Sequence, residues 1–114
     1  MKAAEVEAFC LSRTAATVER PFGPDVQTFK VGGKIFAMLE DRGGLCFKAS
    51  EIAYELLREQ GRAERAPYLP RGGWLRVASV EDWDAPELSD LITHSHRLVS
   101  QGLTRKVRQS LGLE

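Results

Sequence analysis

The sequence is poor in the residues from which catalytic and metal sites are usually built. It has only two cysteines and two histidines among 114 residues. Cys10 and Cys46 lack the close spacing of metal and redox motifs, so we expect two buried thiols. His94 and His96 would point to opposite flanks of a helix and could not readily share one ion. No serine, cysteine or lysine lies in a nucleophile motif, so we expect no enzyme, no metal site and no cofactor.

The chain also lacks a long apolar run and an excess of either charge. Without a span of about 18 apolar residues or a leader pattern, we expect a cytoplasmic protein that does not enter a membrane. Sixteen Lys and Arg balance sixteen Asp and Glu, so net charge alone cannot attract DNA. The charges are partly segregated, because residues 97–108 carry no acidic residue and residues 81–90 no basic one. Two ends of a solvated helix surface would give the same pattern.

The length fits one domain, residues 1–114, which we expect to be monomeric. There is no internal repeat, low-complexity tract or convincing linker. Alternating β-branched and aromatic residues predict four strands, at residues 26–31, 34–39, 45–49 and 74–80. The proline- and glycine-containing residues 62–73 suit either a basic connecting loop or a short edge strand and turn.

Gly32-Gly33 fits a two-residue hairpin turn, which sets the register of the first two strands. It lacks the following Lys-Ser/Thr and helix of a phosphate-binding loop. One face of this hairpin is expected to meet the helices, and it carries Phe29, Val31, Phe36 and Met38. Lys30 then points from the opposite, more open face.

Helical spacing and capping residues predict three helices. The first covers residues 3–12, the second runs from a cap at Ser50 to a stop at Gly61, and the long third runs from Asp84 to near Gly102. A basic tail follows. The inward positions expected in the second helix are Ile52, Ala53, Leu56 and Leu57. These elements predict an α+β, two-layer domain: an antiparallel sheet of about four or five strands with the N- and C-terminal helices on one face.

The order of these motifs resembles the MmcQ/YjbR family across nearly the whole chain. The matching pieces are Pro21-Phe22-Gly23-Pro24-Asp25, Phe29-Lys30-Val31-Gly32-Gly33-Lys34 with Phe36-Ala37, Tyr68-Leu69 before Trp74, and His94-Ser95 with Leu98-Val99 before the basic end. The resemblance implies a fold like that of CyaY and frataxin. It also implies DNA binding through hairpins that act as wings, whose tips here would be Gly32-Gly33 and residues 71–74.

Two departures qualify what the resemblance implies. Iron binding in the frataxin group relies on a dense acidic ridge, for which the first helix here offers only Glu5 and Glu7, so we do not expect iron. Family members often carry a Lys- or Arg-rich run with Asn before the tryptophan, where this chain has Pro70-Arg71-Gly72-Gly73. The two glycines remove side chains that could read bases but leave phosphate contact open.

The DNA-binding hypothesis rests on cationic and aromatic side chains that could reach the phosphates of double-stranded DNA. They are Lys30, Lys34, Lys48, Arg65, Arg71, Trp74, Arg76, Arg105, Lys106 and Arg108. A tryptophan in the core and arginines that only solubilise the surface would give the same pattern. The neutral composition and the interrupted turn at residues 70–73 favour the alternative, a protein-interaction or small-ligand-binding module without DNA affinity.

Overall fold

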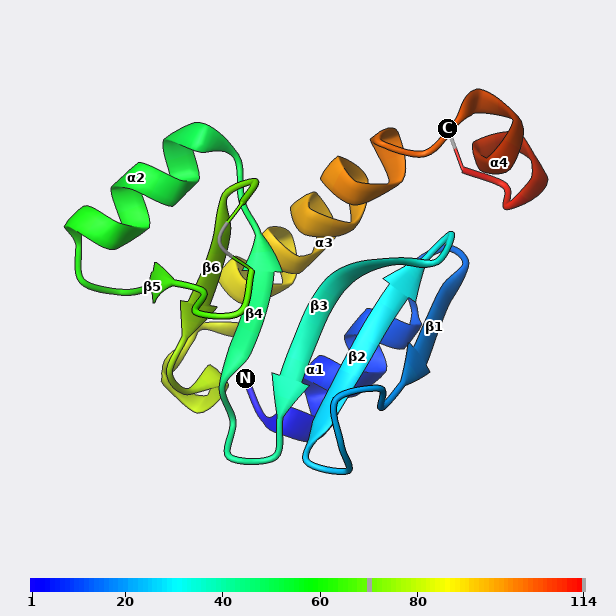
Figure 1. Ribbon diagram of the computed structural model, residues 1–114. Coiled ribbons are helices and arrows are strands. Elements are labelled where there is room, and N and C mark those ends of the chain that lie inside the picture. The colour runs from blue at the N-terminus through cyan, green and yellow to red at the C-terminus, as the bar shows by residue number, and fades with distance from the viewer. Residues whose placement is uncertain (70, 114) are drawn as a thin grey trace.

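A six-stranded antiparallel sheet organises the computed structural model, which describes residues 1–69 and 71–113 (Figure 1). The strand order is β1-β2-β3-β4-β6-β5. The strands are β1 Ala16–Glu19, β2 Val26–Val31, β3 Lys34–Glu40, β4 Leu45–Lys48, β5 Glu64–Arg65 and β6 Trp74–Val77.

The sheet is wider than the four or five strands expected, because the edge strand β1 was not predicted and the other edge, β5, is a strand of only two residues. β1 is exposed at three of its four positions and β5 at both. β1 alternates apolar and polar residues in the sequence Ala-Thr-Val-Glu, but it contains only one large apolar side chain and was not predicted. β5 is the short edge strand that was one of the two alternatives for residues 62–73, while Pro70, part of the expected turn, lies outside the described residues.

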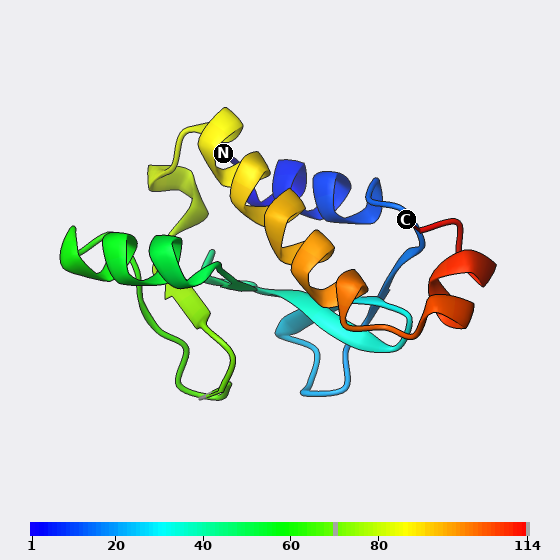
Figure 2. The ribbon, with the colours of Figure 1, turned by 90° about the horizontal axis from the view of Figure 1, so that it is seen from above.

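Helices cover one face of the sheet, as expected. The elements are α1 Ala3–Leu11, α2 Glu51–Glu59, the 3-10 turn η1 Val80–Asp82, α3 Ala85–Gln101 and α4 Arg105–Ser110. Figure 2 shows α1 and α3 side by side above the sheet, with two loops projecting from the opposite face. The fully buried side chains between these layers include Phe29, Phe36, Phe47, Leu75, Leu88 and Ile92. The expected basic tail is a short helix, α4, capped by the Thr104 hydroxyl, which accepts a hydrogen bond from the Val107 N–H.

A β-bulge at Phe36 corrects the predicted register. Val31 pairs with Lys34 as expected, but Phe29 pairs with Ala37 rather than with Phe36. The extra residue turns Phe36 and Ala37 to the same side, into the core beneath the helices. Met38 therefore lies on the opposite face, in a small cluster with Cys46 and Ala66.

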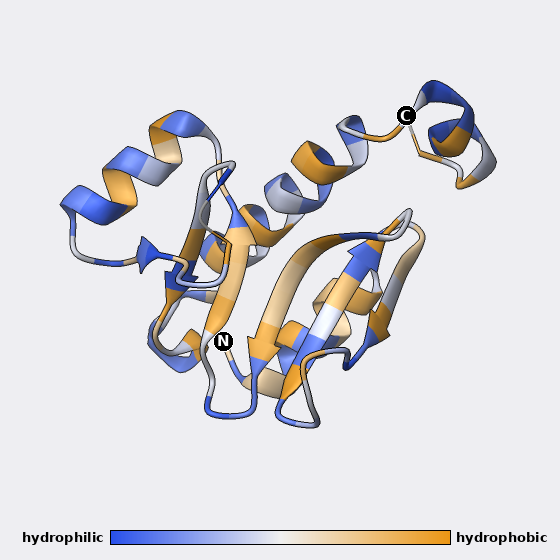
Figure 3. Cartoon of the chain, viewed as in Figure 1, coloured by the Kyte–Doolittle hydropathy of each residue, from blue (hydrophilic) through white to orange (hydrophobic). Residues whose placement is uncertain are grey.

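The loop that joins β5 to β6 covers part of the sheet face that was expected to be open. Ala66 is buried, and Leu69 packs against Met38 and Cys46. The central strands are therefore apolar towards both layers, and Figure 3 colours β3 and β4 as hydrophobic along most of their length. Lys48, at the end of β4, is a polar exception.

α2 packs inward only two of the four residues predicted to face the core, Ala53 and Leu57. Leu57 is its buried residue, and Ala53 and Tyr54 pack against the core. Ile52 and Leu56 are 81% and 49% exposed, so the expectation that they face inward was wrong. The helix lies beside the edge strand β5 rather than over the sheet, so only one side of it packs against the rest of the domain.

Ser95 of α3 bridges β3 and β4 where these strands separate. The ladder between them ends at Ala37 and Phe47, so Phe36 and Lys48 would be the next pair in register. Instead the Ser95 hydroxyl accepts a hydrogen bond from the Lys48 N–H (2.9 Å) and donates one to the Phe36 carbonyl (2.7 Å). Ser95 is fully buried, so these bonds replace those that the two strands would otherwise exchange.

The tip of the β2–β3 hairpin packs against the segment between α3 and α4. Gly32 has a φ of +57°, and a Cβ at this position would lie 2.6 Å from the Leu103 Cδ1 atom. Glycine therefore allows both the turn and the close contact with Leu103. The contact places the hairpin tip beside the start of α4.

We expect Ser95→Ala to destabilise the fold by about 2–4 kcal/mol, because it leaves the Lys48 N–H and the Phe36 carbonyl without partners. Urea denaturation monitored by circular dichroism measures this free energy of unfolding. Ser110→Ala is the matched control, since its exposed hydroxyl bonds only to the Val107 carbonyl in the same helix. Equal stabilities of the two variants would contradict the role given to Ser95.

Candidate nucleic-acid interface

A hollow of about 300 Å³ opens where β3 and β4 separate. Lys34 and Ile35 from β3, Lys48 from β4 and Trp74 from β6 line it, and the floor is formed by Leu98, Val99 and Gly102 at the end of α3. None of these described lining residues is acidic. Two predicted site lysines and the predicted tryptophan therefore meet at one place, although they come from three strands.

The two lysines enter the hollow from opposite sides. The Lys34 ammonium lies beside Gly102, with its Nζ 4.0 Å from the position of a Cβ there. This is the C-terminal end of α3, whose partial negative charge favours a cation. The Lys48 stem runs along the Gly72 backbone, with its Cε 3.5 Å from the position of a Cβ on that glycine. Both ammonium groups are thus positioned by backbone, without a carboxylate partner in any ion pair found among the described residues.

Trp74 belongs partly to the core and partly to the surface. It is half-buried and packs against both apolar clusters, and it pairs with Lys48 across β4 and β6. Arg71 is exposed on the turn just before it. The structure thus combines the two interpretations of this tryptophan, since its ring contributes to packing while one side borders the hollow.

α4 presents the C-terminal basic residues beside the tip of the β2–β3 hairpin (Figure 1). Arg105 and Lys106 are exposed in its first turn, which contains no acidic residue, and Arg108 lies one turn further on. Cations at a helix N-terminus are opposed by the helix dipole. These cations therefore do not stabilise the start of α4.

Three predicted cations lie elsewhere. Lys30 forms an ion pair with Glu19 of β1, the strand that the sequence did not reveal. Arg76 is held by Glu40, and Arg65 lies on the edge strand β5 opposite Leu75. The structure thus brings together Lys34, Lys48 and Trp74, with Arg71 and α4 at the flanks, and leaves Lys30, Arg65 and Arg76 outside this group.

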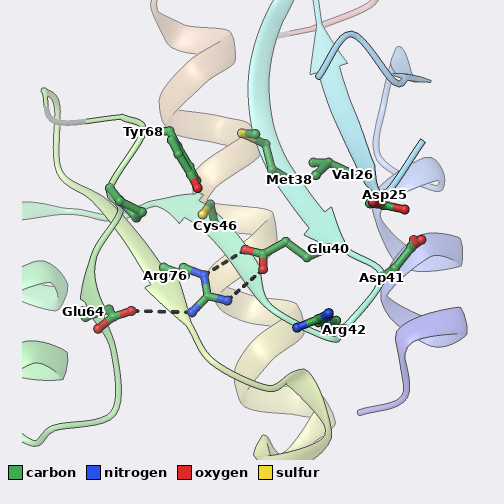
Figure 4. Close-up of a pocket in the computed structure, with 11 residues that line it drawn as sticks. Asp25, Val26, Met38, Glu40, Asp41, Arg42, Cys46, Glu64, Tyr68 and Arg76 are labelled. Atoms are coloured by element: carbon green, nitrogen blue, oxygen red, sulfur yellow. Dashed lines mark hydrogen bonds and ion pairs between the residues drawn. The ribbon is translucent and has the colours of Figure 1, made fainter. Parts of the chain in front are cut away.

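A larger cleft, of about 540 Å³, lies on the same sheet face towards the other end of the strands (Figure 4). Its floor includes Met38 and Cys46, and its walls come from the two loops that project from this face. Charged and aromatic side chains complete its lining: Asp25, Glu40, Asp41, Arg42, Glu64, Tyr68 and Arg76. Four carboxylates face two guanidinium groups, so the cleft is acidic.

The Arg76–Glu40 pair forms one wall of this cleft. The Arg76 Nε and Nη2 atoms each donate a hydrogen bond of 2.8 Å to the Glu40 carboxylate, and Nη1 lies 3.5 Å from Glu64. These bonds hold the pKa of the Glu40 carboxyl below its usual value, although partial burial acts in the opposite direction. A Cβ on Gly44 would lie 2.5 Å from the Arg76 Nη2, so a glycine there leaves room for the pair.

Sequence reasoning missed Glu40 as a partner of Arg76, because the two residues are 36 positions apart. It also missed two exposed aromatic side chains on the loops around the cleft, Phe22 (62% exposed) and Tyr68 (78% exposed). Both stand in segments quoted for the family resemblance, which was a usable signal.

Cys10 and Cys46 are buried thiols, as expected. Both are free and buried, and burial raises the pKa of the Cys10 thiol to about 12 and that of Cys46 to about 11.

In residues 1–69 and 71–113, no group of three or more His, Cys, Asp or Glu converges as metal ligands. Over the same residues no helix combines the length and apolar character needed to cross a membrane.

A comparison with models of protein families identifies the family of this chain. The model of the YjbR family matches residues 11–98. The uncharacterized protein YbdF of Escherichia coli O157:H7 is 33% identical over 90 residues, which are 75% of this chain and 74% of YbdF. The crystal structure of the Deinococcus radiodurans protein DR2400, with the domain DUF419, superposes with a TM-score of 0.85 at 22% identity, covering 99% of this chain and 89% of that one. This likeness shows the shared fold.

We expect Glu40→Gln to destabilise the protein by about 1–2 kcal/mol at neutral pH, because a neutral amide bonds Arg76 more weakly than a carboxylate does. The pKa of Glu40 is lowered in the folded state, so its contribution is complete above the usual value of 4.5 and is lost as the pH falls through the folded value.

The stability difference between the wild type and Glu40→Gln should therefore shrink as the pH falls below 4.5. Urea denaturation at a series of pH values measures it. Asp41→Asn, a change at an exposed carboxylate in the adjacent turn, should show no comparable loss at neutral pH. A difference between wild type and Glu40→Gln that persists unchanged in acid would refute the assignment.

Proposed function

This chain belongs to the YjbR family, and we propose that it is a non-catalytic DNA-binding protein that holds double-stranded DNA by its phosphates. The observation that carries the proposal is the hollow between β3 and β4, where Lys34, Lys48 and Trp74 meet without an acidic residue in the described lining. The resemblance to MmcQ/YjbR proteins supports the same function.

Phosphate contact is the chemistry that suits these side chains. A lysine ammonium is a compact charge on a flexible stem, and each phosphate that it neutralises releases counterions from the DNA. The basic side chains run from Arg71 at one turn, through Lys48 and Lys34, to α4 beside the other hairpin tip. In this arrangement the DNA backbone follows the end of the sheet, and the two turns act as wings on either side of it.

The acidic cleft determines which end of this sheet face can meet DNA. It lies on the same face as the hollow but towards the opposite end of the strands, where its four carboxylates repel a phosphate backbone. A protein without net charge can still bind DNA when its charges are separated in this way. The single domain, the monomeric state, the cytoplasmic location and the CyaY-like form of the fold are further parts of the proposal.

We expect the double variant Lys34→Gln/Lys48→Gln to bind duplex DNA about tenfold more weakly at low salt, and its slope of log affinity against log salt to fall by about 1.8, because two phosphate contacts are lost. Fluorescence anisotropy of a labelled duplex, titrated at several salt concentrations, measures both quantities. Circular dichroism checks that the variant is folded.

The matched control is Lys30→Gln/Arg58→Gln, which removes the same amount of charge. Both control residues pair with a glutamate in the structure, Lys30 with Glu19 and Arg58 with Glu55. It should keep the affinity of the wild type within about twofold, because both cations lie outside the lining of the hollow and each already has a carboxylate partner. Equal losses in the two double variants, or no binding by the wild type at low salt, would reject DNA binding through the hollow.

The 540 Å³ cleft favours a second candidate function, a small-ligand-binding module without DNA affinity. Its volume lies in the range of small-molecule sites, and its apolar floor and charged walls are typical of them. The excess of carboxylates selects cationic ligands, and Tyr68 offers a ring at the rim for their apolar or aromatic parts.

A fragment screen by ligand-detected NMR tests this candidate. We expect aromatic amines to bind in preference to aromatic carboxylates, and Tyr68→Ala to weaken that binding. The variant should fold normally, because Tyr68 is 78% exposed. Tyr54→Phe, on α2 and outside the cleft, is the control. If amines and carboxylates bind alike, or Tyr68→Ala binds like the wild type, the cleft is not this site.

A further inference from the structure

A third hollow, of about 380 Å³, lies on the helix side of the molecule. It is formed where residues 13–14 after α1, the second half of α3 and residues 112–113 meet. Its polar lining is Arg13, Thr93, His96, Arg97, Ser100 and Gln101. No acidic residue is among the described lining residues, which distinguishes this hollow from the cleft on the sheet face.

Arg13 is held in place by neutral groups only. Its guanidinium lies 4.0 Å from the centre of the Phe9 ring. Nη1 donates a hydrogen bond of 3.4 Å to the Thr93 hydroxyl, and Nη2 donates one of 3.1 Å to the Ser12 hydroxyl. The Nε atom is enclosed and has no hydrogen-bond partner. Arg13 is thus a positioned, half-buried cation, and none of the ion pairs found among the described residues includes it.

Two further side chains, the cation Arg97 and the imidazole of His96, line the same hollow. Arg97 lines it from α3 and forms no ion pair among those found in the described residues. His96 donates a hydrogen bond from Nε2 to the Thr14 carbonyl (2.9 Å). Burial lowers the pKa of His96, and the charge of Arg13 lowers it further. A partly buried charge without a counter-charge loses hydration, and two cations repel each other, so these two arginines favour an anion.

We propose that this hollow binds the phosphate group of a small phosphomonoester between Arg13 and Arg97. A guanidinium presents paired N–H donors that match phosphate oxygens. The Thr93 hydroxyl, which Arg13 already contacts, is positioned to donate to a third oxygen. The volume exceeds that of inorganic phosphate alone, so the ester group has room beside it. The site lies on the opposite side of α3 from the hollow between β3 and β4, and does not depend on DNA binding.

The test is an NMR titration of the whole protein with glycerol 3-phosphate and, separately, with inorganic phosphate, each against sodium chloride of equal ionic strength. We expect the phosphate probes to move the amide resonances of Thr14, His96 and Arg97. The anion should also raise the pKa of His96, read from its ring proton, because it offsets the charge of Arg13. The exposed His94 on the same helix is the internal reference.

Arg97→Gln should weaken glycerol 3-phosphate binding at least about tenfold without lowering the thermal midpoint of the free protein, because Arg97 is exposed and its loss removes a repulsion. Arg13→Gln should weaken binding similarly. If Arg13→Gln does not fold, Arg97→Gln still tests the proposal. Arg58→Gln, on α2, is the control. Phosphate shifts no larger than those with chloride, or unchanged binding by Arg97→Gln, would overturn the proposal.

A final arm separates a small phosphomonoester from the phosphates of nucleic acid. Duplex DNA added at a concentration that saturates the wild-type protein should leave its affinity for glycerol 3-phosphate unchanged. Displacement of glycerol 3-phosphate from Arg13 and Arg97 by DNA would show that the hollow belongs to the DNA surface, and would overturn the assignment to a small ligand.

Discussion

The hydrogen bonds of one buried serine determine how this sheet is shaped. β3 and β4 are paired up to Ala37 and Phe47, and the hydroxyl of Ser95 then takes the place of the next pair. Because the freed N–H and carbonyl are both satisfied, the strands can diverge without the cost of unpaired buried backbone groups. The same bonds join α3 to both strands. The hollow that contains Lys34 and Lys48 exists because the strands diverge here, and its floor is the continuation of the helix that supplies the serine.

Ion pairs divide the surface charges of this protein into regions. Arg76 is bonded to Glu40, and Lys30 to Glu19, so these cations are neutralised within the sheet. Lys34 and Lys48 lie next to backbone rather than carboxylates. An overall charge of zero therefore results from an acidic cleft and separate basic hollows, and it carries little information about what the surface can bind.

Local sequence signals predicted the elements that depend on local structure. The Gly32-Gly33 turn, the Asp84 cap, the four predicted strands and the three predicted helices are all present, although the strand predicted at residues 74–80 ends at Val77. The failures arose where distant residues decide. The bulge at Phe36 depends on how β3 passes beneath α3, and the exposed face of α2 depends on its place beside the edge strand.

The candidate site shows the same division. Lysines 34 and 48 and Trp74 could be identified by residue type, but their convergence could not, because it depends on the separation of β3 and β4. The pairing of Lys30 required β1, an edge strand of four residues that was not predicted. Arg13, just after α1, and Arg97, on α3, were missed because isolated arginines resemble ordinary surface residues until their partners are known.

α3 lies between this arginine pair and the two lysines, and Ser95 fixes it to the sheet. Coupling between two sites requires an element with two arrangements that both sites influence. A helix fixed in this way gives no such element, so the two basic hollows should act as independent sites for phosphate.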